Sequence, residues 1–185
     1  MSRRLVMLDR DGVLNRDRPE SVRTPDELEM LPGAAAAVAA LNRAGVKVAL
    51  VSNQSVVGRG IVSAAMLERI QEELRQRLAR EGARLDLALV CTDPPWAATE
   101  RRKPGAGMLR EAMRHFAVAP SQAAMVGDAL GDLQAAAAAG CARILVRTGK
   151  GAATQAAGIP RELLPVAVRA DLAEAVSALL ADGAA

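Results

Sequence analysis

Short apolar runs of strand length alternate along the chain with longer segments in which apolar residues recur at helical spacing. Five runs are predicted to be strands: Leu5–Leu8, Val46–Val51, Leu87–Cys91, Ala124–Val126 and Ile144–Val146. Five segments are predicted to be helices: Gly33–Ala44, Ser63–Glu81, Gly105–Phe116, Leu130–Ala139 and Asp171–Leu180. This alternation is typical of α/β proteins with helices on both faces of a parallel sheet. The pattern therefore predicts a Rossmann-like three-layer sandwich with a central parallel sheet.

Three segments do not follow the alternation: Arg16–Leu31, Gln54–Val62 and Thr92–Arg102. Each of them follows the end of a predicted strand. Ligands of open α/β sheets bind beyond the carboxyl ends of the strands, so these loops are where we expect specificity. The chain has 185 residues, and we expect one domain over residues 1–185.

Composition narrows the classes of partner. Trp96 and Phe116 are the only aromatic residues, so a surface on which nucleic-acid bases stack is not expected. The net charge of +3 comes from scattered residues with only short basic clusters, which favours a small anionic ligand over nucleic acid. Two cysteines do not make a disulfide framework, and no signal peptide or membrane span is recognised. We therefore expect a soluble, cytoplasmic protein.

The first predicted strand runs into two carboxylates, Asp9 and Asp11, which are followed by Gly12. Two such groups at a strand end can hold a divalent cation and perform nucleophilic or acid–base chemistry beside it. The calcium loop of an EF-hand is excluded, because Val13 and Leu14 occupy positions that need a ligand and a glycine. An Asp-rich turn without chemistry remains the alternative.

The second predicted strand runs into Ser52, Asn53 and Gln54, whose short polar groups suit phosphate oxygens, although an ordinary turn would use the same residues. Arg102 and Lys103 precede a predicted helix, where a lysine can meet a phosphoryl group; a solvated charge run is the alternative.

The fourth predicted strand ends at Asp128, which would complete a site with Asp9 if the two strands lie close together. Asp132, one turn later, would ligate a metal, brace its shell or cap the helix.

These four strand ends together resemble the haloacid dehalogenase-like phosphotransferase superfamily over the span from Val6 to Gly151. The resemblance is greatest to its D-glycero-D-manno-heptose 1,7-bisphosphate phosphatases, and it rests on four motifs: Leu8–Asn15, Ser52–Ser55 with Gly58–Gly60, Arg102–Pro104 and Leu145–Lys150. Histidinol-phosphate phosphatases share these features except the last. The resemblance implies the fold of this superfamily. The inserts after the first two motifs are each under about 20 residues, so we expect no large cap domain.

The resemblance also implies a Mg2+-dependent phosphomonoesterase that removes the C7 phosphate of a sugar bisphosphate, in ADP- or GDP-heptose biosynthesis. Asp9 would be the nucleophile, and Asp11 would be the acid and then the base, for which its pKa would have to be raised. Mg2+ would be held by Asp9, the backbone carbonyl of Asp11, and Asp128.

The same resemblance assigns the substrate contacts. Ser52, Asn53 and Lys103 would hold the phosphoryl oxygens, with Gln54 as a further contact. Arg59 and Arg102 would bind the rest of the substrate, including its distal phosphate.

The sequence departs from the family's pattern at two places, and three alternative functions remain. Many relatives carry a structural zinc loop, but here Cys91 stands without the other ligands, so we expect no structural zinc. Ala129 stands where a lysine often follows the Gly-Asp pair, which leaves the substrate preference open. The alternatives are a phosphatase for histidinol phosphate, one for nucleic-acid 3'-phosphate ends, and a non-catalytic phosphate-binding module. We expect a monomer.

Overall fold

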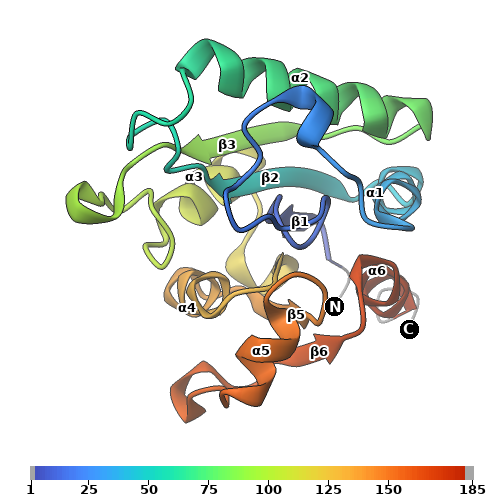
Figure 1. Cartoon of the computed structure of the whole chain (residues 1–185). Coiled ribbons are helices and arrows are strands. Elements are labelled where there is room, and N and C mark those ends of the chain that lie inside the picture. The colour runs from blue at the N-terminus through green and yellow to red at the C-terminus, as the bar shows by residue number, and fades with distance from the viewer. Residues whose placement is uncertain (1–2, 182–185) are drawn as a thin grey trace.

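Six parallel strands form one sheet in the computed structural model, which describes residues 3–181 (Figure 1). Their order across the sheet is β3-β2-β1-β4-β5-β6, so the first strand lies in the middle. The strands are β1 (Leu5–Leu8), β2 (Lys47–Asn53), β3 (Leu87–Cys91), β4 (Ala123–Gly127), β5 (Ala142–Val146) and β6 (Ala167–Arg169). The prediction of a parallel sheet is confirmed, and all five predicted strands are present.

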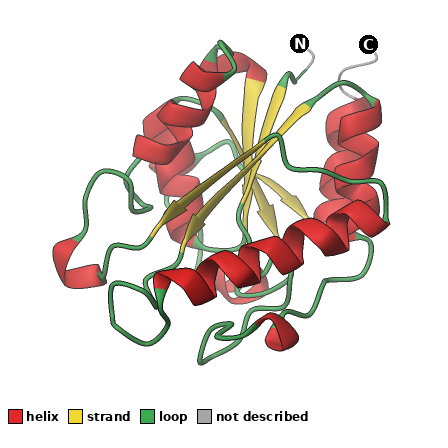
Figure 2. Ribbon diagram, turned by 90° about the horizontal axis from the view of Figure 1, so that it is seen from above, coloured by secondary structure: helices red, strands yellow, loops and turns green. Residues whose placement is uncertain are grey.

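Helices flank the sheet on both sides, as Figure 2 shows. They are α1 (Ala34–Arg43), α2 (Ala64–Arg80), α3 (Gly107–His115), α4 (Leu130–Ala139), α5 (Gly151–Ala156) and α6 (Leu172–Ala181). Both ends of α2 are capped: the Ser63 hydroxyl accepts a hydrogen bond from the Met66 amide at 3.1 Å, and Gly82, just after the helix, takes a left-handed conformation. The three-layer α/β sandwich is therefore confirmed, with α5 and β6 as elements that the apolar pattern did not predict.

The core consists of two main layers, because successive side chains of each strand point to opposite faces of the sheet. Val6 and Leu8 of β1 pack with buried residues of α1, α2 and α6. Leu5 and Met7 of the same strand pack with α3 and α4 on the other face. Strands buried on both faces consist of continuous apolar residues, and β1 is fully buried. This burial fixes where β1 ends and the chemistry begins.

Within the described residues, the segments that lead from β1 to α1, from β2 to α2 and from β3 to α3 are loops whose only helical structure is short 3-10 turns. Trp96 lies in one of these turns, and 74% of its surface is exposed. Gly58 and Thr92 bring two of the loops together, because a Cβ atom on Gly58 would lie 2.3 Å from the Thr92 carbonyl oxygen. Within residues 3–181 no helix is both long and apolar enough for a membrane span.

Candidate active site

The turn after β1 begins the site. The backbone amide of Asp9 still donates to the Val126 carbonyl of β4 at 3.1 Å, so Asp9 is held at the very edge of the sheet. Gly12 then takes φ +81°, which favours glycine. A Cβ atom there would lie 2.0 Å from a carboxylate oxygen of Asp128. The turn can therefore approach the end of β4 closely only because residue 12 has no side chain.

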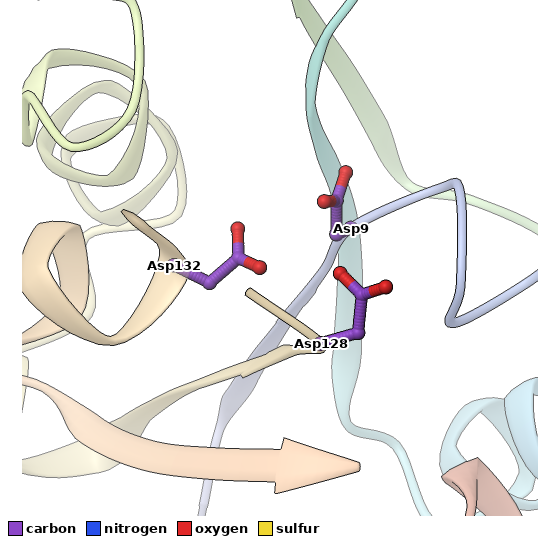
Figure 3. Close-up of side chains that lie close together, drawn as sticks. All are labelled: Asp9, Asp128 and Asp132. Atoms are coloured by element: carbon purple, nitrogen blue, oxygen red, sulfur yellow. The ribbon is translucent and has the colours of Figure 1, made fainter. Parts of the chain in front are cut away.

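Three carboxylates meet at this edge (Figure 3): Asp9 after β1, Asp128 after β4 and Asp132 in the first turn of α4. One oxygen from each lies within 4.8 Å of the others. Asp132 also accepts a hydrogen bond from the Ala129 amide at 3.0 Å. Of the roles considered for Asp132, capping of α4 is thus observed, and the same side chain also belongs to the carboxylate cluster.

Lys103 supplies the positive charge of the cluster. Its Nζ atom lies 2.6 Å from Asp132 Oδ1 and 3.1 Å from Asp9 Oδ2, and it donates to the Val51 carbonyl at 2.8 Å. The Asn53 side chain holds the Lys103 backbone with two hydrogen bonds, of 2.9 and 3.1 Å. Burial works against the charge of Lys103, yet Asp132 and Asp9 outweigh it and hold the pKa of the ammonium above its usual value.

One lysine does not neutralise three carboxylates that lie this close together. Burial, with added repulsion from Asp132 and Asp11, outweighs the attraction of Lys103 and raises the pKa of Asp9 to about 6. Burial, together with Asp9 and Asp132, raises the pKa of Asp128 to about 7. A divalent cation with oxygen ligands would relieve this repulsion, and the cluster offers the carboxylates that Mg2+ prefers. The residues present therefore fit such an ion.

Asp11 lies in a different environment from the cluster. Its carboxylate accepts hydrogen bonds from Asn15 at 2.9 Å, from Gln54 at 2.8 Å and from the fully buried Arg10 at 3.1 Å. Burial alone would raise the pKa of Asp11, but Arg10, Asn15 and Gln54 together bring it below its usual value. The raised pKa that an acid requires is therefore not found in this arrangement, because Arg10 favours the ionised carboxylate.

A cavity of about 320 Å³ opens over the cluster. Of the predicted site residues, it is lined by Asp9, Asp11, Asn53, Arg102, Lys103 and Asp128. Ser52 and Gln54 are buried and do not line it; the Gln54 amide donates to the Ser52 hydroxyl at 3.0 Å. Arg59 is exposed on the loop after β2, also off this cavity. The structure thus unites the carboxylates, Asn53 and the Arg102–Lys103 pair.

Four polar residues that were not predicted also line this cavity: Asp17, Ser21, Ser55 and Lys150. Lys150 ends the last of the motifs that carried the family resemblance, and Asp17 and Ser21 lie in a loop that did not follow the strand–helix alternation, so both signals were present in the sequence. A larger cavity of about 460 Å³ lies near the start of β5, away from the carboxylates. We place the chemistry in the smaller one, because it holds the convergent polar groups.

Known proteins resemble the chain over nearly its whole length. A family model described as HAD-hydrolase-like matches residues 100–175. A Pseudomonas aeruginosa protein named D-glycero-beta-D-manno-heptose-1,7-bisphosphate 7-phosphatase is 41% identical over 97% of this chain and 99% of its own length. A Bordetella bronchiseptica protein of the same name is 43% identical over 84% of this chain and 87% of its own.

The similarity extends to solved structures. The crystal structure of D,D-heptose 1,7-bisphosphate phosphatase from B. bronchiseptica, complexed with magnesium and phosphate, matches with a TM-score of 0.91 and 40% identity. The match covers 98% of this chain and 99% of that one.

Proposed function

The chain belongs to the haloacid dehalogenase-like hydrolases, among the D-glycero-D-manno-heptose 1,7-bisphosphate 7-phosphatases, and from this membership we propose its reaction and the roles of its residues. It is a Mg2+-dependent phosphomonoesterase that hydrolyses the C7 phosphate of the heptose 1,7-bisphosphate. The observation that carries the proposal is that Asp9, Asp128 and Lys103 converge in one cavity. The fold that holds this cavity matches a heptose bisphosphate phosphatase over 98% of this chain.

Asp9 is the nucleophile of the proposed reaction. Its carboxylate oxygen attacks phosphorus, the bond between phosphorus and the sugar oxygen breaks, and an aspartyl-phosphate forms. A carboxylate and a phosphate dianion repel each other, and the Lys103 ammonium beside Asp9 offsets part of this repulsion. Asn53 acts with it by fixing the backbone of Lys103.

Asp11 gives its proton to the departing sugar oxygen and then takes one from the water that hydrolyses the aspartyl-phosphate. This cycle releases phosphate and regenerates both carboxyl groups. The acid step requires the Asp11 carboxyl to leave Arg10, Asn15 and Gln54, because contacts with these residues favour its ionised form.

Asp9, Asp128 and the backbone carbonyl of Asp11 would hold Mg2+. The bound ion supplies charge stabilisation for the phosphoryl oxygens. Asp132 supports the site by holding Lys103 and the start of α4.

The remaining parts of the proposal concern the whole protein. We propose one domain over residues 1–185, and the membership of β1 and β6 in the same sheet supports it. The protein works as a cytoplasmic monomer on a small sugar bisphosphate, with no nucleic-acid or membrane partner.

Phosphate release in Mg2+ tests the reaction. Heptose 1,7-bisphosphate should be hydrolysed with a kcat/KM at least about tenfold above those of histidinol phosphate and of a 3'-phosphorylated oligonucleotide. Asp9→Asn should abolish turnover with the fold intact by circular dichroism, and Asp26→Asn, on an exposed turn, is the matched control. Activity of Asp9→Asn within tenfold of the wild type would refute the assignment of the nucleophile.

A further inference from the structure

Within the described residues, three cationic side chains line the cavity over the carboxylates: Arg102, Lys103 and Lys150. Lys103 is buried, and its ammonium already contacts Asp9, Asp132 and a backbone carbonyl. Arg102 donates to the Asp93 carbonyl at 3.0 Å. Lys150 differs from both, because 65% of its side chain is exposed. It is therefore the most accessible lysine for a group that enters from solvent.

The backbone of Lys150 is fixed against the reacting centre. Its amide donates to Asp128 Oδ2 at 2.8 Å, and the nearby Thr148 hydroxyl donates to the Gly12 carbonyl at 2.6 Å. Between them, Gly149 takes φ +56°. The start of the Lys150 side chain is thereby held beside the carboxylate cluster while its ammonium reaches the mouth of the cavity.

The Lys150 ammonium lies 3.3 Å from Asp17 Oδ2 across this mouth. The pair is partly exposed, and such pairs are weak, so an arriving dianion can displace the carboxylate. Ala129, which follows Asp128 and also lines the cavity, adds no cation that would bind a second phosphate in place of Lys150.

We propose that Lys150 is a specificity residue that binds the second phosphate group of the substrate while the first lies at Asp9. The proposal rests on the proposed function, since only a bisphosphate has a second such group. It differs from the expectation from sequence, in which Arg59 shared this role with Arg102, because Arg59 is off the cavity. An ammonium on a flexible stem is suited to a phosphate whose position varies with the sugar.

Kinetics on two substrates test the proposal: heptose 1,7-bisphosphate and heptose 7-phosphate, which keeps the scissile group and lacks the distal one. Loss of a charge-assisted hydrogen bond to phosphate corresponds to about a tenfold to hundredfold loss of affinity. Lys150→Ala should therefore raise KM for the bisphosphate at least about tenfold and reduce the ratio of the two kcat/KM values by a similar factor. Lys150→Arg, which keeps the charge, should retain most of that ratio.

Lys47→Ala is the matched control, because Lys47 also forms an exposed ion pair of 3.3 Å, with Asp86, on another part of the surface. It should leave the ratio unchanged. An equal loss on both substrates in Lys150→Ala would overturn the proposal by showing an effect on Asp128 or on the fold. An unchanged ratio would overturn it as well. In both cases wild-type activity on the bisphosphate would leave the proposed function standing, whereas an inactive wild type would refute both.

Discussion

At the scale of single residues, the clustered carboxylates of the site lower the stability of the metal-free protein. Asp9, Asp128 and Asp132 converge where water is largely excluded, and Lys103 is the cation that contacts two of them. Without a cation, burial and repulsion disfavour the ionised form of Asp128, whose pKa rises to about 7. The geometry that suits a divalent ion is therefore one that the metal-free protein maintains at a cost.

Asp128→Asn should stabilise the metal-free protein. When folding raises the pKa of an aspartate, the folded protein becomes less stable as pH rises from the pKa of the unfolded state to that of the folded state. For Asp128 these pKa values are near 4 and about 7. The penalty is complete at pH 8, and Asn removes it while its amide oxygen still accepts from the Lys150 amide. Thermal unfolding in chelator at pH 8 should show a gain of at least about 1 kcal/mol.

The gain should be smaller at pH 5, and Asp26→Asn should show neither effect. A loss of stability at pH 8 would mean that the amide and the charge of Lys150 stabilise ionised Asp128 by more than burial and repulsion in the cluster destabilise it.

At the scale of elements, the segment after β5 packs against the chain where it leaves both β1 and β4. A Cβ atom on Gly149 would lie 2.1 Å from Asp128 Oδ2 and 2.5 Å from the Gly12 Cα atom. The second contact is with backbone and is not relieved by rotation of a side chain. The turn after β1 and the end of β4 are thus packed against a residue more than a hundred positions away from Gly12.

Gly149→Ala should destabilise the protein by more than about 2 kcal/mol and remove activity. About 1–2 kcal/mol comes from the left-handed backbone, and displacement of Gly12 and Asp128 adds to it. Gly82→Ala separates the two causes, because Gly82 has φ +69° with open space around it. Urea unfolding should give the control only the backbone cost. Equal losses in both variants would show that the close contacts at Gly149 are relieved without cost.

The elements differed in how far the sequence predicted them. Strands such as β1, buried on both faces, stand out as apolar runs. In contrast, β6 has three residues at the sheet edge and α5 has six, too few for a period to show. The carboxylates at the strand ends were predictable because they directly follow these apolar runs. The low pKa of Asp11 was not, because it depends on how Arg10 folds back, and neither was the position of Arg59 off the cavity.

At the scale of the whole molecule, the functional groups lie on one edge of the sheet. The loops after β1, β2, β3, β4 and β5, together with the end of β2 and the first turn of α4, supply the lining of the cavity. Cys91 lies in β3 and is buried, and burial raises the pKa of its thiol. A protonated thiol is a poor zinc ligand. Cys91 is therefore not among the groups that we propose as metal ligands, which are the carboxylates of the cluster.

Metal removal and elemental analysis should show whether the protein depends on Mg2+ or holds zinc. Chelation should abolish phosphate release and Mg2+ should restore it, because the carboxylate cluster depends on a hard cation. Elemental analysis of the purified protein should find well under one equivalent of zinc. Stoichiometric zinc that withstands dialysis would show that the loop after Cys91 binds metal after all.

The exposed Trp96 has a spectroscopic consequence. It is the only indole in a chain without tyrosine, and it lies on a turn between β3 and Lys103 and not in the core. Native emission should peak near that of free tryptophan in water, and acrylamide should quench it efficiently. Unfolding will change that emission little, so melting curves must be recorded by far-ultraviolet circular dichroism. The same indole becomes a local optical reporter for the loop that carries Arg102.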